Sequence, residues 1–232
     1  MNLQDQVSIC VTSLNRVDAL KLMWKSFVHH HGEGFHLKVY EQGSTDGAKE
    51  YAESIATEFI DGPTVPHGCA LDEMVRRTET EYVLICDNDI EFLAPVLQRM
   101  LDECEFCVCA PRIYDMGSIE LSGYRCYGQE GIDPSRALFK TKPLQKILEH
   151  FSFAGYDSRE LGKHYDTGTM VHEVARVQDL PVATPDWIWG KNDGIWHWGA
   201  ITWAMWGPMG DQNRIVADER YVEIQRRLAT YG

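Results

Sequence analysis

The feature that most constrains this chain's fold is the stretch at residues 81–92, which reads EYVLICDNDIEF. Residues 82–86 are apolar without alternation, which is typical of a strand covered on both faces, as in a parallel sheet between helices. Asp87, Asn88 and Asp89 follow at once. Open α/β sheets bind ligands at the carboxyl ends of their strands, so this stretch predicts an α/β fold with a site at its end.

Asp87 and Asp89 point the same way in extended backbone, so their carboxylates can converge on one point. Two converging carboxylates repel each other unless a cation lies between them. A hard divalent ion such as Mg²⁺ or Mn²⁺, itself holding a diphosphate, is the usual partner. The alternative is a polar strand end in which one aspartate caps the next turn, and the pair alone does not decide between the two.

Strands and helices alternate through the first half of the chain. We expect strands at 7–13, 37–41, 59–60 and 82–86, and helices at 18–30 with Asp18 as N-cap, at 48–57 and at 68–78. This order predicts a doubly wound, mostly parallel central sheet flanked by helices. The second half is less regular: we expect a helix at 95–103, a strand at 106–113, loops and short strands over 114–160, a helix capped by Asp166 or Thr167, and a terminal helix at 217–231.

Charge and composition exclude some functions. The net charge of −13 argues against nucleic acid as the main partner, because no basic run offsets it. The polar start shows no secretory signal, and no apolar run approaches the roughly 20 residues that span a membrane. The seven cysteines, an odd number, favour a reducing compartment. We therefore expect a cytoplasmic protein without a transmembrane segment, and peripheral membrane contact stays open.

Four motifs in order resemble one known family. Residues 7–16 read VSICVTSLNR, residues 41–47 read EQGSTDG, and Gly68-x-Ala70 precedes the 81–89 strand that ends in Asp-Asn-Asp. Together they are similar to the family-2-like glycosyltransferases of GT-A fold. The resemblance covers residues 7–92 and implies one domain over residues 1–232. Residues 1–95 would form its nucleotide-binding half and residues 96–232 a smaller acceptor-binding half.

The resemblance also implies roles for individual residues. Glu41 stands where the family has an aspartate that accepts from the uracil N–H, whereas Asp46 is expected to fix its turn. The implied contacts to the nucleotide sugar come from Thr12, Ser13, Asn15, Arg16, Glu41, Asp72, Asp87 and Asn88. The implied metal ligands are Asp87, Asp89 and His197, the last resembling a late histidine of some GT-A enzymes; packing among aromatics is the alternative for His197.

The general base of an inverting transferase takes the proton of the acceptor hydroxyl. Tyr165-Asp166-Thr167-Gly168 resembles the context of this carboxylate in the family, so Asp166 is the predicted base. A plain N-cap is the alternative role, and Asp157 and Glu120 are the next candidates.

The sequence departs from the family pattern at three places. Thr12 replaces the usual proline, Glu41 is one methylene longer than aspartate, and Leu71-Asp72 stands where relatives often have Arg-Asn. Six tryptophans fall within residues 187–206, where they either stack on sugar rings or fill a core. Residues 190–194, between them, are predicted to form a loop over the donor.

These observations predict a metal-dependent glycosyltransferase, hexosyl- or deoxyhexosyl-, that uses Mn²⁺ or Mg²⁺. It would move a sugar from a nucleotide-diphosphate donor, first of all a UDP-sugar, to a hydroxyl of a glycan or other acceptor. The family resemblance implies that the transfer proceeds with inversion. One alternative is a nucleotidyltransferase. Such an enzyme is expected to have a Gly-rich, basic first loop, and residues 12–16 lack this pattern. A nucleotide-sugar- or carbohydrate-binding protein that keeps the fold without turnover is the other alternative.

Overall fold

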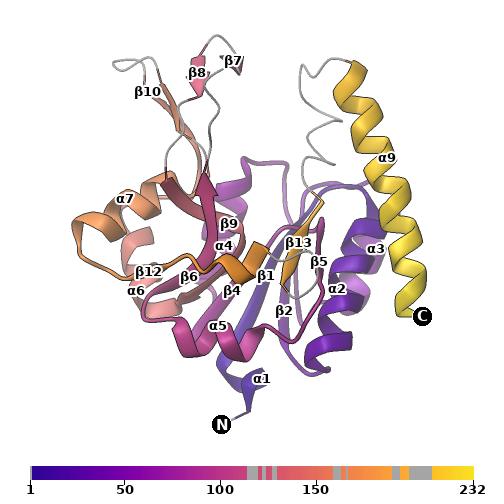
Figure 1. Ribbon diagram of the computed structural model, residues 1–232, viewed down its shortest axis with the longest axis horizontal. Helices are drawn as coiled ribbons and strands as arrows, with labels where there is room; N and C mark the ends of the chain where they lie inside the picture. Colours follow the sequence, from indigo (N-terminus) through magenta and orange to yellow (C-terminus); the bar gives the residue numbers. More distant parts are fainter. Residues whose placement is uncertain are drawn as a thin grey trace.

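The computed structural model describes residues 2–113, 120–121, 124–126, 130–158, 163–165, 167–189, 194–198 and 211–232. A seven-stranded sheet forms its centre (Figure 1). Its strands, in spatial order, are β12 (Val182–Ala183), β6 (Cys107–Ile113), β9 (Glu130–Lys140), β4 (Tyr82–Cys86), β1 (Val7–Ser13), β2 (His36–Glu41) and β3 (Glu58–Asp61).

The strands of the first half run parallel, as predicted. β1 pairs in parallel with β2 and with β4, and β2 with β3. β9 lies between β4 and β6 and is antiparallel to both. The prediction of loops and short strands missed this strand, because Gly131 and Pro134 signal a loop. Ala137, Leu138 and Phe139 are fully buried there, and their burial between two neighbouring strands decides the conformation.

Helices cover both faces of the sheet, and β4 shows why its sequence does not alternate. Leu84 and Cys86 pack in one buried cluster and Val83 and Ile85 in another, on opposite faces. This confirms the doubly wound α/β architecture. The helices are α1 (Leu3–Gln6), α2 (Val17–His31), α3 (Ala48–Ile55), α4 (His67–Arg76), α5 (Leu97–Glu103), α6 (Thr141–Leu148), α7 (Thr169–Val177) and α9 (Asp211–Leu228), with 3-10 turns η1 (Asp186–Trp189) and η2 (Ala229–Tyr231).

The start of α2 differs from the prediction that Asp18 caps it. The N-cap is Arg16, in left-handed backbone, and the carboxylate that accepts from the first helical N–H is Asp46, 2.9 Å from the Val17 nitrogen. Asp18 instead accepts from Tyr221 and Gln225 of α9. A partner distant in sequence has replaced the local cap.

Two smaller sheets complete the fold. One holds β10 (Tyr156–Ser158), β11 (Lys163–Tyr165), β8 (Tyr124–Cys126) and β7 (Glu120–Leu121), and it projects above the central sheet in Figure 1. The other pairs β13 (Ile195–His197) antiparallel with β5 (Ile90–Phe92). None of the described helices combines the length and apolarity of a membrane-spanning segment.

Candidate active site

The candidate site forms where neighbouring parallel strands end. Ser13 and Glu41, the last residues of β1 and β2, are partners in the sheet register. Cys86, the last residue of β4, pairs with Val11 on the other side of β1, and Asp87 follows it. The polar ends of three adjacent strands therefore lie along one edge of the sheet.

Backbone hydrogen bonds hold the aspartate turn between β4 and β5. The Asp87 N–H donates to the Ser135 carbonyl at 2.9 Å, which ties the turn to β9. In the pairing of β5 with β13, His197 lies opposite Ile90, and the Trp198 N–H donates to the Asp89 carbonyl at 2.9 Å. This pairing brings a residue from the far end of the chain to the aspartates.

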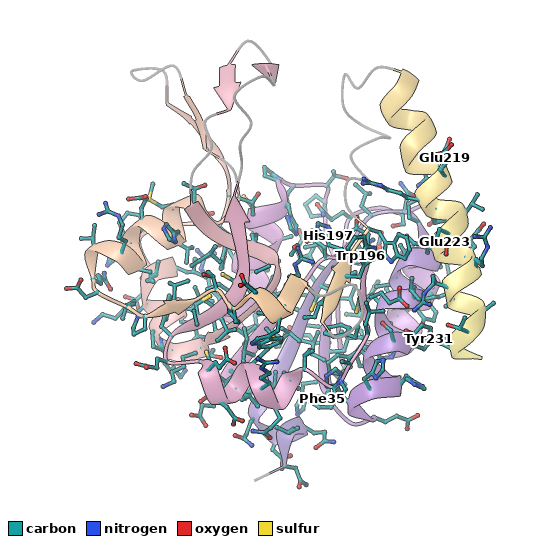
Figure 2. The ribbon with its side chains drawn as sticks, viewed as in Figure 1. Phe35, Trp196, His197, Glu219, Glu223 and Tyr231 are labelled. Atoms are coloured by element: carbon teal, nitrogen blue, oxygen red, sulfur yellow. The ribbon has the colours of Figure 1, made fainter. Side chains whose placement is uncertain are left out.

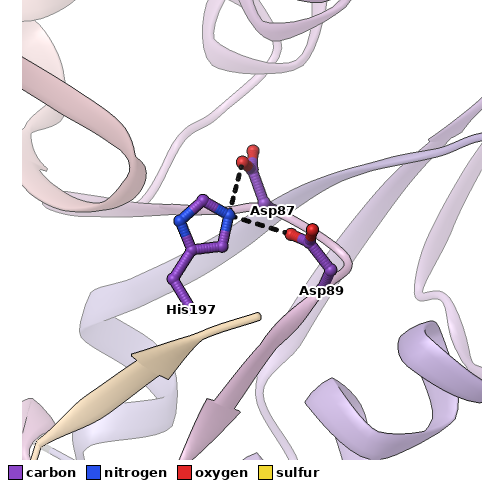
Figure 3. Close-up of side chains that lie close together, drawn as sticks. All are labelled: Asp87, Asp89 and His197. Carbon is purple, nitrogen blue, oxygen red and sulfur yellow. Dashed lines mark hydrogen bonds and ion pairs between the residues drawn. The ribbon is translucent and has the colours of Figure 1, made fainter. Parts of the chain in front are cut away.

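Asp87, Asp89 and His197 converge on one point (Figure 3). His197 Nε2 lies 3.1 Å from Asp89 Oδ1 and 3.6 Å from Asp87 Oδ2, and one ligand atom from each residue fits within 4.8 Å. The 3.1 and 3.6 Å separations from His197 suit atoms that ligate one ion at about 2.1 Å, and two carboxylates with an imidazole are an acceptable donor set for Mn²⁺ or Mg²⁺. The residues present fit a divalent cation.

A second histidine, which sequence reasoning missed, contacts the same aspartate. His67 is the first residue of α4, and its Nε2 lies 3.3 Å from Asp87 Oδ1. Asp87 therefore stands between two imidazoles, one at each carboxylate oxygen. The only signal in the sequence is that His67 immediately precedes Gly68 of the Gly-x-Ala motif.

Glu41 is fully buried at the end of β2, yet only one of its carboxylate oxygens has a hydrogen-bond donor in the described structure. Oε1 accepts from the Ser44 N–H at 2.5 Å, whereas Oε2 has no partner among the described residues. A buried oxygen without a donor is costly, so this oxygen is a free acceptor at the strand ends for a donor from outside the described residues.

The turn after β2 is locked to the loop after β1. Asn15 Oδ1 accepts from the Thr45 N–H at 2.8 Å, and the Asn15 N–H donates to Ser44 Oγ at 2.6 Å. Asp46 bonds the first N–H groups of both α2 and α3, which confirms that it fixes the turn. Asn15 thus contributes to the shape of this loop pair.

Arg16 and Asp72, two of the residues predicted to contact the nucleotide, interact with other side chains or backbone groups of the protein. The Arg16 guanidinium lies 4.6 Å from the centre of the Tyr221 ring and 3.3 Å from Asp218, both on α9. Buried Asp72 accepts from the Phe153 N–H at 2.9 Å and from the Ser152 hydroxyl. Burial raises the pKa of Asp72, and these bonds partly oppose that rise. The nucleotide contacts of Arg16 and Asp72 stay predictions.

The remaining predicted residues divide into two groups. Thr12, Ser13 and Asn88 are buried near the strand ends, and Ser13 Oγ and Asn88 Nδ2 have no hydrogen-bond partner in the described part of the chain. The other group has no described side chain: Asp166 lies outside the described residues altogether, and only the backbone is described for Asp157 in β10 and Glu120 in β7.

Three of the six tryptophans at 187–206 have described side chains, and one of them, Trp187, packs away from the metal ligands. Trp187 donates to Glu103 at 3.1 Å, with Arg99 4.2 Å above its ring. Trp196 and Trp198 meet edge to face at 6.2 Å, on either side of His197. Trp203, Trp206 and most of the expected loop at 190–194 lie outside the described residues.

The fold is that of the GT-A class of glycosyltransferase, a mixed sheet with helices on both faces. The profile of Glycosyl transferase family 2 matches residues 8–163, and the chain belongs to this family. A search of the curated proteins found no match.

Solved structures share the fold at low sequence identity. The mannosyltransferase PcManGT from Pyrobaculum calidifontis in complex with GDP-Man and Mn²⁺ is 15% identical, with a TM-score of 0.55 over 97% of this chain and 73% of that one. S. aureus TarS 1-349 in complex with UDP is 11% identical, with a TM-score of 0.54 over 96% and 71%. M. tuberculosis glucosyl-3-phosphoglycerate synthase is 12% identical, with a TM-score of 0.53 over 97% and 81%.

Proposed function

We propose that this glycosyltransferase moves a hexosyl or deoxyhexosyl group from a nucleotide-diphosphate donor, first of all a UDP-sugar, to a hydroxyl of a glycan or other acceptor, with inversion. The observation that carries the proposal is the convergence of Asp87, Asp89 and His197 at the end of β4. These three side chains would hold Mn²⁺ or Mg²⁺, and the bound cation would neutralise the charge that develops on the departing diphosphate.

The distance between Glu41 and the aspartates supports a nucleotide as the donor. β2 and β4 are separated only by β1, so their ends lie two strand spacings apart, roughly 10 Å. This separation is comparable to the length of a nucleoside diphosphate, with its base at Glu41 and its diphosphate at Asp87 and Asp89. The free Glu41 Oε2 would accept from the imide N–H of a base. Uracil, thymine and guanine carry such a donor, whereas cytosine and adenine do not.

The histidine favours Mn²⁺ over Mg²⁺, because Mg²⁺ prefers an all-oxygen octahedral shell. Among proteins of similar fold, one structure is a complex with GDP-Man and Mn²⁺ and another a complex with UDP, which agrees with this assignment.

We assign Asp166 as the general base. Gly168, two residues after it in the chain, lies against β9, where a Cβ would meet the Ile132 carbonyl at 2.9 Å. Further along β9, the Ser135 carbonyl accepts from the Asp87 N–H. β9 therefore contacts both Gly168, two residues after Asp166, and the metal turn, and the assignment of Asp166 is supported by this together with the family resemblance.

The test is calorimetric titration of UDP with Mn²⁺ and then with EDTA. We expect binding that depends on the metal and is lost in Asp89→Ala, while the control Asp102→Ala, an exposed carboxylate on α5, binds as the wild type does. GDP or dTDP binding in place of UDP would change the donor only. Absence of binding by every nucleotide would overturn the proposal.

Turnover separates an enzyme from a protein that only binds the donor. UDP-sugars are screened for transfer and hydrolysis, and Asp166→Ala should abolish turnover while keeping metal-dependent UDP binding. A wild type that binds donor but never turns it over would favour the alternative, a nucleotide-sugar-binding protein of the same fold.

We further propose that residues 1–232 form one domain with a nucleotide-binding half at 1–95 and an acceptor-binding half at 96–232. We propose that the protein acts in the cytoplasm. It would contact a membrane peripherally where the acceptor is lipid-linked. Fractionation of cells that express the tagged protein tests the location.

A further inference from the structure

The last helix, α9, packs outside the central layers against α2, with Ile224 on Ala19 and Leu22 (Figure 1). None of the family motifs quoted above lies on this helix. Side chains from α9 and from the turn η2 after it nevertheless contact β5, which follows Asp89, and Trp198, which follows His197. Figure 2 shows Tyr231 beside the carboxyl end of the helix, with His197 and Trp196 nearer the top of the sheet.

The first contact is to β5, the strand that follows Asp89. Arg227 donates to Glu91 Oε1 from Nη2 at 2.6 Å and from Nε at 2.9 Å, and the Tyr231 hydroxyl donates to the same oxygen at 2.8 Å. The Glu91 side chain is 1% exposed. A carboxylate buried to this degree needs its donors, so the contact fixes the position of β5 relative to the helix.

The second contact is to the residue after His197. Arg220 Nη1 donates to the Trp198 carbonyl at 2.9 Å, while the Trp198 N–H donates to the Asp89 carbonyl. The backbone of Trp198, next to His197, is therefore held at its carbonyl from α9 and at its N–H from the aspartate turn. Arg220 and Arg227 stand two helical turns apart, so they lie on one side of α9.

β5 and β13 depend on contacts with other elements for their stability. β5 and β13 form a two-stranded sheet of three residues each, separate from the central sheet. A two-stranded ribbon of this size is not stable by itself. Arg136 supports it from β9 by donating to the Ile195 carbonyl at 2.8 Å. The contacts from the end of the chain supply further support.

We propose that the end of the chain is a positioning element of the metal site: Arg227 and Tyr231, through Glu91, and Arg220, through Trp198, set the places of Asp89 and His197. The inference rests on the proposed function, since it concerns the same site. Residues that orient metal ligands from a second layer typically change metal affinity tenfold to a hundredfold when they are replaced.

The test compares Arg227→Met and Arg220→Met with Arg226→Met. Arg226 is the matched control, because it is an exposed arginine of the same helix that pairs only with Glu223 among the described residues. Two quantities are measured on folded protein: Mn²⁺ affinity in the presence of UDP, and amide hydrogen exchange of residues 90–92 and 195–198 without metal. We expect Mn²⁺ affinity to fall about tenfold and exchange to accelerate in both variants, but not in the control. Arg227→Lys should restore part of the affinity.

Wild-type affinity and exchange in folded Arg227→Met and Arg220→Met would overturn the proposal. If Arg227→Met fails to fold, the proposal is tested with Tyr231→Phe and Arg220→Met by the same two measurements. Each of these variants removes the hydrogen bonds of one side chain only. If the wild type binds no Mn²⁺ with any nucleotide, the proposed function fails, and exchange in the metal-free variants still shows whether α9 holds the two strands.

Discussion

His67 Nε2 lies 3.3 Å from Asp87 Oδ1, on the side of the carboxylate away from His197. His67 begins α4, so the orientation of Asp87 is coupled to a helix on the other face of the sheet from α2. An imidazole this close to one carboxylate oxygen restricts the orientation of Asp87 and leaves the other oxygen facing His197, as outer-shell partners of metal ligands do.

We therefore predict that His67→Ala weakens Mn²⁺ binding about tenfold in the presence of UDP, by loss of the group that orients Asp87. His67→Gln should retain more affinity, because its amide can still contact Asp87 from the start of α4. The matched control is His150→Ala, an exposed histidine after α6. Calorimetry at fixed pH gives the affinities, and equal affinity in His67→Ala and the wild type would remove His67 from the site.

Replacement of Glu41 by glutamine tests the base-binding role. The variant keeps an oxygen for the Ser44 N–H but turns the free carboxylate oxygen into an N–H donor, which repels the imide N–H of uracil. We expect UDP affinity to fall at least tenfold, about 1.4 kcal/mol or more, while binding of CDP is unchanged or improved. The comparison of the two nucleotides is made by titration in Mn²⁺. Equal loss for both would show that the change acts on the fold and not on base recognition.

His31 makes folding sensitive to mild acid. Its Nε2 accepts from the Leu97 N–H at 3.3 Å while its Nδ1 faces the Phe27 carbonyl at 3.0 Å, which requires the neutral ring. Burial lowers the pKa of His31 to about 4, against the small opposing effect of the Phe27 bond. The unfolded chain thus binds a proton that the folded chain does not. The contribution of His31 to stability is complete above pH 6.5 and is lost as the pH falls toward 4.

We predict a loss of about 2 kcal/mol in the free energy of unfolding between pH 7 and pH 5 from this residue. Urea denaturation of the wild type and of His31→Gln across this range isolates the effect, since other titrating groups are common to both. Parallel curves for the two proteins would contradict it.

Gly68 is required by a close approach and not by its backbone angles. A Cβ at this position would overlap the backbone of Phe153 and Ala154. Glycine to alanine within a helix normally stabilises by about 1 kcal/mol, so the sign here is diagnostic. We predict that Gly68→Ala destabilises by about 2 kcal/mol through overpacking. The exposed neighbour Cys69→Ala should be nearly neutral, and thermal unfolding compares them.

Local patterns in the sequence were enough to predict the order of strands and helices in the first half. They also placed Asp87 and Asp89 at the end of a strand buried on both faces. Both follow from short-range physics: the period of apolar residues sets the element type, and the break in that period sets its end. The family motifs depend on the same local segments.

The family resemblance named His197 as a metal ligand, but only the tertiary structure shows that the pairing of β13 with β5 carries it to Asp89. Two other contacts came from the tertiary structure alone: the packing of α4 brings His67 to Asp87, and α9 reaches Glu91. β9 becomes a central strand because two neighbours bury it, although its glycine and proline signal a loop. Contacts of this kind depend on register and packing between segments that are far apart in the chain, and no local periodicity encodes them.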